Sequence, residues 1–212
     1  MEKPTYITLL LDKSQSMEVT KKSTIDGFNK FLSSQKEDGL NKIVSLYQFN
    51  QRRYTTFENL DLKKVENLNY DAFIPEGSTA LNDAIGFTIE RTNHITKNKD
   101  YNIIFVILTD GEENSSRNYD SHDIEKSILK MKERDWNFIF IGANQDAILS
   151  GAKYGIDVNS SLTFSQSDGG TANCFDSLSC AVNRQINSDG GAISFTSEER
   201  EASQSHSYVA LN

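Results

Sequence analysis

Residues 6–16 read YITLLLDKSQS, a nearly continuous apolar run that ends in oxygen-bearing side chains. An apolar run of this length predicts a strand buried on both faces, as in the centre of a parallel sheet. Asp12, Ser14 and Ser16 follow it at every second position, where a loop that turns from strand into helix can direct alternate side chains to one point. The stretch therefore predicts a central strand with a candidate site at its carboxyl end.

Strand and helix patterns alternate along the rest of the chain. Strand-like runs occupy residues 42–49, 53–57, 102–108, 136–141 and 161–164, and segments with helical spacing of apolar residues lie between most of them. Only three residues separate the runs 42–49 and 53–57, too few for a crossover helix, so the second of them is predicted to run antiparallel at the sheet edge. We therefore expect an α/β fold: a doubly wound, three-layer, Rossmann-like sheet, mostly parallel with one antiparallel edge strand.

The length of 212 residues fits one domain of this class, which we assign to residues 1–192. Residues 193–212 are assigned to a polar C-terminal tail. From Ser194 onward this segment shows no usable apolar face, and we expect it to be loose. Cys174 and Cys180 stand six positions apart in a predicted helix, about 240° around its axis, so we expect both thiols to stay unpaired.

Composition and charge restrict the class of partner. The formal net charge is -8, and no predicted helix face gathers Lys and Arg, which argues against nucleic acid. The first residues show no basic segment followed by an apolar one, and no apolar run has the length to span a bilayer. We therefore expect a cytoplasmic protein without membrane contact. No feature of the sequence indicates an oligomeric state.

Two more oxygen-bearing side chains fall at the same predicted edge of the sheet. Thr79 ends a short loop before a helix, and Asp110 directly follows the run 102–108 and Thr109. Hydroxyl and carboxylate oxygens suit Mg²⁺, Mn²⁺ or Ca²⁺ and not Zn²⁺ or Cu²⁺. Each residue alone has a plainer explanation as a helix cap or a turn former. The five together, in this order, favour a metal site.

Asp12-x-Ser14-x-Ser16 followed by Thr79 and Asp110 resembles the metal-ion-dependent adhesion site of von Willebrand factor A domains. The resemblance implies that Ser14, Ser16 and Thr79 contribute hydroxyl ligands, whereas Asp12 and Asp110 bind largely through water. It implies Mg²⁺ as the cation, with Mn²⁺ or Ca²⁺ as alternatives.

The resemblance covers roughly residues 5–187 and includes the antiparallel third strand. Residues 141–147 (IGANQDA) and 167–171 (SDGGT) are also similar to segments of small intracellular A-domain proteins of bacteria and their phages. The implied function is a protein-binding module, in which an acidic side chain of a protein partner replaces a metal-bound water. The alternative is a non-catalytic subunit of a larger bacterial or phage assembly, beside an ATPase or in defence and counter-defence, with a structural metal.

No catalytic residues are predicted. A dinucleotide-dependent oxidoreductase would need a glycine-rich turn after the first strand, and residues 12–16 contain no glycine. A phosphotransferase of the haloacid dehalogenase type would want a second acid where Ser14 stands. His94, His122 and His206 are scattered, which argues against a zinc site and against a Ser-His pair.

Other polar residues near the predicted edge have open roles. Asn144 and Gln145 either contact a ligand or, as the more ordinary interpretation, cap the next helix. Glu112, Glu113 and Asn114 either tune the field at the metal and select partners, or simply form a solvated loop.

Overall fold

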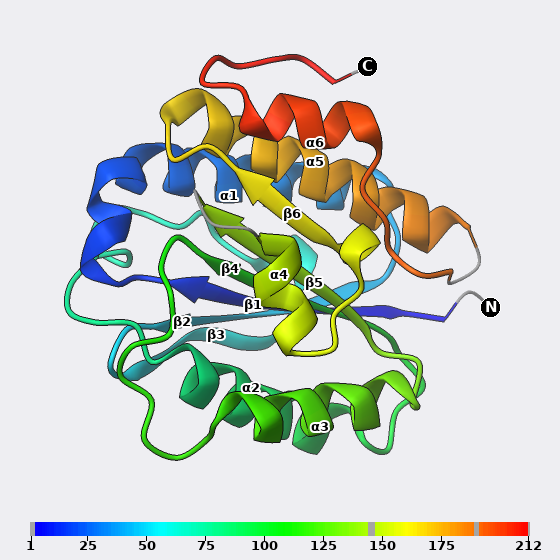
Figure 1. The fold of residues 1–212 in the computed structure, drawn as a ribbon. Coiled ribbons are helices and arrows are strands. Elements are labelled where there is room, and N and C mark those ends of the chain that lie inside the picture. Colours follow the sequence, from blue (N-terminus) through cyan, green and yellow to red (C-terminus); the bar gives the residue numbers. More distant parts are fainter. Residues whose placement is uncertain (1–2, 144–146, 189–190, 212) are drawn as a thin grey trace.

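The computed structural model describes residues 3–143, 147–188 and 191–211 of the chain. Within these residues six strands form one sheet in the order β3-β2-β1-β4-β5-β6 (Figure 1). Neighbouring strands run parallel except β3, which pairs antiparallel with β2 at the edge. The predicted α/β fold with one antiparallel edge strand is therefore confirmed. The strands are β1 Thr5–Asp12, β2 Lys42–Phe49, β3 Arg53–Asp61, β4 Asn102–Thr109, β5 Asn137–Ala143 and β6 Ser161–Phe164.

Helices cover both faces of the sheet, and together they make three layers (Figure 1). One face carries α1 (Lys21–Glu37) and α5 (Asp168–Asn187), and the other carries α2 (Leu81–Thr96) and α3 (Ser121–Lys132). The short helix α4 (Ala147–Lys153) follows β5. Among the described residues, no helix has both the length and the apolar character needed to cross a bilayer.

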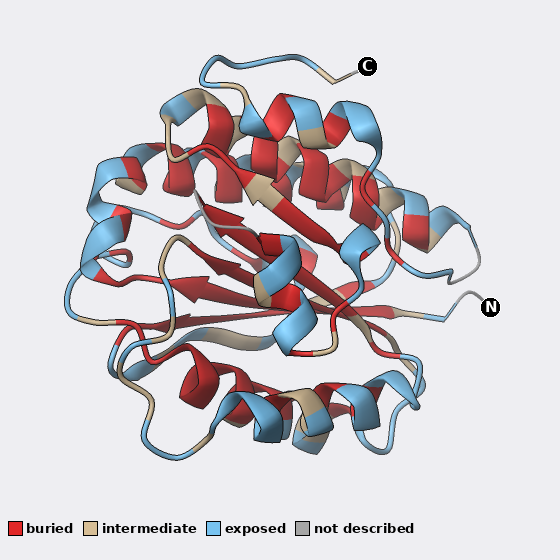
Figure 2. Ribbon diagram, viewed as in Figure 1, coloured by how far each residue is buried: buried red, intermediate tan, exposed pale blue. Residues whose placement is uncertain are grey.

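The strands β1, β2, β4 and β5 each supply side chains to two cores. In β1, Ile7, Leu9 and Leu11 belong to the core under α1 and α5, whereas Tyr6 and Leu10 belong to the core under α2 and α3. Successive side chains of a strand point to opposite faces, so an unbroken apolar run is what a sheet covered on both faces requires. Figure 2 shows the central strands buried and the outer helix surfaces exposed.

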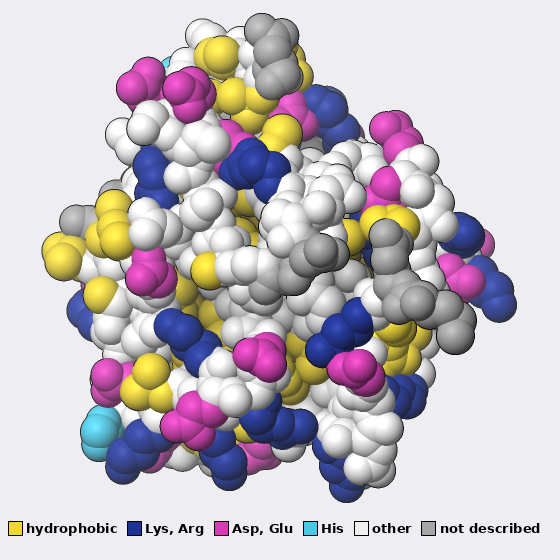
Figure 3. Space-filling model, turned by 90° about the vertical axis from the view of Figure 1, so that its right-hand side faces the viewer, with side chains coloured by type: hydrophobic (Ala, Val, Ile, Leu, Met, Phe, Trp, Pro, Cys, Tyr) yellow, Lys and Arg dark blue, Asp and Glu magenta, His cyan; other side chains and the backbone are white. Residues whose placement is uncertain are grey.

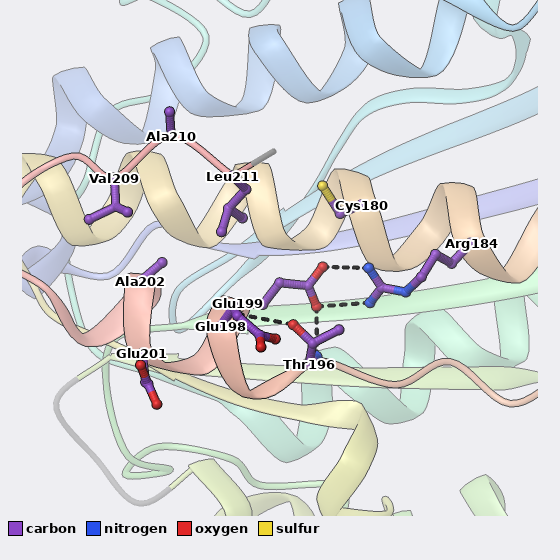
Figure 4. Close-up of a pocket in the computed structure, with 10 residues that line it drawn as sticks. All are labelled: Cys180, Arg184, Thr196, Glu198, Glu199, Glu201, Ala202, Val209, Ala210 and Leu211. Atoms are coloured by element: carbon purple, nitrogen blue, oxygen red, sulfur yellow. Dashed lines mark hydrogen bonds and ion pairs between the residues drawn. The ribbon is translucent and has the colours of Figure 1, made fainter.

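The C-terminal segment corrects one expectation. Residues from Ser194 do not form a loose tail, because helix α6 (Ser197–Gln204) packs on α5 and the side chains of Phe195 and Ala202 are buried. Glu199 forms a bidentate ion pair with Arg184 of α5, with Nη2–Oε2 at 2.8 Å (Figure 4). The segment has too few apolar residues to show periodicity, and its docking combines the burial of Phe195 and Ala202 with polar contacts to α5. The division of the chain after residue 192 stays a prediction.

The two cysteines lie on α5 as free thiols, as expected from their spacing: Cys174 is buried and Cys180 is half-buried.

The order in which the chain adds strands to the sheet reverses between β1 and β4. After β1 it proceeds to β2 and β3 on one side, and it then crosses back to β4, β5 and β6 on the other. This is the place where doubly wound sheets bind ligands, outside the carboxyl ends of the strands. Figure 3 shows the opposite side, which faces the amino ends of the parallel strands and mixes basic with acidic side chains.

Candidate metal site

Asp12, at the end of β1, is fully buried and held by two hydrogen bonds. Its Oδ1 accepts the backbone N–H of Ser14 at 2.7 Å, and its Oδ2 accepts the hydroxyl of Thr109 at 2.6 Å. Thr109 ends β4, so the carboxylate joins the ends of the two strands between which the sheet order reverses. Buried carboxylates need such donors. Thr109 is a supporting residue that the sequence pattern did not single out.

A chain of hydroxyl groups connects the β1 loop to Asp110. The Oγ atoms of Ser14 and Ser16 lie 3.1 Å apart, and the Ser16 hydroxyl donates to Asp110 Oδ1 at 2.6 Å. The second carboxylate oxygen of Asp110 accepts the side-chain amide of Gln166 at 2.6 Å. Residues separated by about a hundred positions in the sequence thus share one short polar network.

Thr79 is fixed through its backbone beside the same network. Its N–H donates to Asn114 Oδ1 at 2.9 Å, and its carbonyl accepts the N–H of Asn114 at 3.0 Å. A Cβ atom at Gly111 would lie 3.2 Å from Thr79 Oγ1 and 3.7 Å from Ser16 Oγ, so the glycine after Asp110 permits this close approach. The structure therefore brings all five predicted metal-site residues together.

The environment of the two carboxylates disfavours their charge in the absence of a cation. Burial raises the pKa of Asp12 to about 7, although hydrogen bonds from Thr109 and Ser14 act in the opposite direction. Burial also raises the pKa of Asp110, and the hydrogen bond from Ser16 lowers it in part. A divalent cation between these groups would favour their ionised forms.

The donor set fits a hard divalent cation. Three hydroxyls and two carboxylates supply only oxygen atoms, which Mg²⁺, Mn²⁺ and Ca²⁺ prefer. Thr79 is buried, and among the described residues its hydroxyl makes no hydrogen bond that would compete with a ligand. In the described part of the chain, no three His, Cys, Asp or Glu side chains are placed so that they could hold a metal ion together. The donors of this site are mainly hydroxyls instead.

The loop after Asp110 is anchored to the start of α2. Glu113 accepts the backbone N–H of Asn82 at 2.8 Å as well as that of Ser116 at 2.7 Å within the loop. Asp83 accepts the backbone N–H groups of three successive loop residues, Arg117, Asn118 and Tyr119. Glu113 is therefore an anchor of the loop, and Asn114 positions Thr79. Glu112 is exposed, and Asn144 and Gln145 lie outside the described residues.

Replacing Asp83 by alanine is expected to lower the free energy of unfolding by about 2–4 kcal/mol, because three backbone N–H groups lose a charged acceptor. Burial raises the pKa of Asp83, but the hydrogen bonds from Asn118 and Arg117 outweigh it and leave the pKa below its usual 3.8. This stabilisation is therefore present above pH 3.8 and is lost as the pH falls through the lower folded-state pKa. Urea denaturation at pH 7 and pH 3 measures both effects, with the exposed Asp71→Ala as control. Equal stability of the two variants at pH 7 would contradict the anchoring role.

Comparison with known proteins gives a family and a fold. A family model described as the von Willebrand factor type A domain matches residues 7–154. Proximal thread matrix protein 1 from the mussel byssus superposes with a TM-score of 0.62 and 18% identity, over 86% of this chain and 48% of that one. The same mussel protein with a zinc-occupied MIDAS motif superposes at 0.59 and 17% identity, over 86% and 48%.

The von Willebrand factor domain of the pilus tip protein Mfa5 from Porphyromonas gingivalis superposes with a TM-score of 0.62 and 12% identity, over 88% of this chain and 97% of that one. At these identities the likeness shows the fold alone. The chain spans about half the length of the mussel protein. No curated protein matches the sequence.

Proposed function

Because this chain belongs to the von Willebrand factor type A domain family, we propose that it captures a protein partner through a bound divalent cation. Domains of this family are usually non-catalytic binding modules that carry a metal-ion-dependent adhesion site. The observation that carries the proposal is the set of hydrogen bonds that joins the ends of β1 and β4 to each other and to the loop of Thr79. The residues proposed to hold the cation are Asp12, Ser14, Ser16, Thr79 and Asp110.

The chemistry of these residues favours an acidic group on the partner. Both carboxylates are engaged by protein donors, Asp12 by Ser14 and Thr109, and Asp110 by Ser16 and Gln166. With both carboxylates reaching the cation through water, the direct ligands are neutral hydroxyls, which do not compensate a double positive charge in the coordination sphere. A bound cation would supply an electrophilic centre on which a carboxylate of the partner restores the balance of charge.

The charge of the whole protein does not oppose such a partner at contact. The net charge of -8 repels acidic surfaces at long range, but physiological salt screens this repulsion beyond about 8–10 Å. Exposed apolar side chains on the loops of the site support a protein as the ligand. Val19 lies on the 3-10 helix Gln15–Thr20, and Ile74 lies just before the loop whose Gly77 carbonyl accepts the N–H of Gln15.

We propose Mg²⁺ as the cation, with Mn²⁺ or Ca²⁺ as alternatives. The donor set does not separate these three ions, since all of them accept oxygen ligands. The preference rests on the abundance of Mg²⁺ in the cytoplasm, which is the proposed location of the protein.

A pulldown under two metal conditions tests the proposed function. Wild-type protein immobilised in Mg²⁺ on the order of 5 mM is expected to retain a partner that EDTA releases, since the proposed contact with the partner runs through the bound ion. Asp110→Ala is expected to retain none, while the exposed control Asp100→Ala behaves as the wild type. A partner held equally in EDTA and by Asp110→Ala would instead favour the alternative, a subunit of a larger assembly that docks without the metal.

A further inference from the structure

Gln166 bridges the two arms of the candidate metal site from a part of the chain outside the family match. It lies between β6 and α5, whereas the match ends at residue 154. Its side-chain nitrogen Nε2 donates to Asp110 Oδ2 at 2.6 Å and lies 3.2 Å from the carbonyl oxygen of Ser16. A carboxamide nitrogen carries two protons, so one side chain can serve both acceptors. Gln166 therefore ties the end of β4 to the loop after β1.

The position of Gln166 is itself set by the C-terminal part of the fold. The backbone N–H of the preceding Ser165 donates to the carbonyl of Ser203 in α6 at 2.9 Å. On the other side, Gly170 in the first turn of α5 packs so closely that a Cβ there would lie 2.2 Å from the Ser165 carbonyl oxygen. These contacts leave the strand-to-helix turn little room to move. The amide of Gln166 is thus presented to Asp110 by a packed segment.

The contact between Gln166 and Asp110 matters for metal binding because it affects the direction of the Ser16 hydroxyl proton. A serine hydroxyl has one proton and two lone pairs, and it can bind a cation only through its oxygen. The proton must therefore point away from the cation. The Ser16 hydroxyl donates its proton to Asp110 Oδ1, and Gln166 occupies the other oxygen of the same carboxylate. With both oxygens engaged, Asp110 is held in the orientation that receives the Ser16 proton.

We propose that Gln166 is a positioning residue of the metal site: by holding Asp110 and the Ser16 carbonyl, it keeps the oxygen of the Ser16 hydroxyl available to the cation. This inference rests on the proposed function, because it concerns the same site. Groups that orient metal ligands from outside the coordination sphere typically contribute 10–100-fold to affinity. Gln166 acts on the ligand Ser16 indirectly, through Asp110, so we expect an effect at the lower end of this range of affinities.

The test compares Gln166→Met with the wild type and with Gln204→Met. Methionine keeps the length of the side chain and removes the amide, and Gln204 is an exposed glutamine at the end of α6. Binding of Mn²⁺ alone is followed by the loss of the free-ion signal in electron paramagnetic resonance, and thermal unfolding is recorded in EDTA. We expect Gln166→Met to raise the Mn²⁺ dissociation constant about tenfold and to unfold in EDTA at the wild-type temperature. Gln204→Met should match the wild type in both measurements.

A double-mutant cycle with Ser16→Ala separates positioning of the Ser16 hydroxyl from a general structural effect. The cycle remains informative when the Gln166→Met protein is less stable in EDTA than the wild type. In a Ser16→Ala background there is no hydroxyl to orient, so Gln166→Met should cause no further loss of Mn²⁺ affinity. Additive losses, or equal affinity of Gln166→Met and the wild type, would overturn the role of Gln166 and leave the metal site intact. Absence of Mn²⁺ binding by the wild type would overturn both. If Gln166→Met does not fold, Gln166→Leu takes its place in the same cycle.

Discussion

Mg²⁺ at a hundredfold excess over its dissociation constant is expected to raise the free energy of unfolding of this protein by about 2.7 kcal/mol, and Asp110→Ala is expected to abolish the gain. A ligand that binds only the folded state stabilises it by this amount. Asp110 carries one of the two carboxylates of the site, and its Oδ1 accepts a hydrogen bond from Ser16 Oγ at 2.6 Å. Its removal takes away both. Thermal and chemical unfolding titrated with MgCl₂, MnCl₂ and CaCl₂ measure the effect.

The control for this prediction is Asp100→Ala. The Asp100 side chain is 87% exposed and pairs with Lys3 near the start of β1, at the opposite edge of the sheet from the site. This variant should keep the full response to the cation, and EDTA should reverse the response in both it and the wild type. A saturable stabilisation that Asp110→Ala retains would show that the ion binds elsewhere. Asp12→Ala is a less direct probe, because it also leaves Thr109 and Ser14 without their buried acceptor.

Phe195→Ala is expected to lower the free energy of unfolding by about 3–5 kcal/mol, as large-to-small changes of buried aromatic residues do. Phe195 is 6% exposed and belongs to the core that lies under α1 and α5. Its backbone N–H donates to the carbonyl of Asn159 at 2.9 Å, so the segment before α6 is fixed to the turn that precedes β6. Denaturant unfolding in EDTA measures this loss without any contribution from a metal.

Glu201→Ala provides the matched control within the same segment, because Glu201 is exposed on α6. Its effect should stay within about 0.5 kcal/mol, as for most surface substitutions. If Phe195→Ala were equally harmless, the segment from Ser194 would be detachable, as its polar composition suggests. With the expected loss, removal of this segment would unfold part of the core, so truncation cannot serve as a clean test of partner docking.

The alternation of strands and helices, the antiparallel β3 and the grouping of the five candidate residues at one edge of the sheet could all be predicted from the sequence. Apolar periodicity reports local geometry, and the three residues between β2 and β3 leave no room for a crossover. The rule that parallel strands present their carboxyl ends at one edge then brings Asp12 and Asp110 together. β3 was underestimated, since it continues past Phe57 to Asp61 through an irregular register that breaks strand periodicity.

The contacts that hold the site in place depend on the tertiary structure alone. Gln166 meets Asp110 across 56 positions, and Asp83 meets the loop of Arg117 across 34, so no local pattern signals either contact. The docking of α6 has the same cause, because a helix of only eight residues gains its stability from contacts with the finished surface of α5. The sequence by itself determined which oxygen atoms reach one edge of the sheet. The packed chain decided which donors hold them there, because hydrogen bonds between distant segments exist only once the strands and helices are in place.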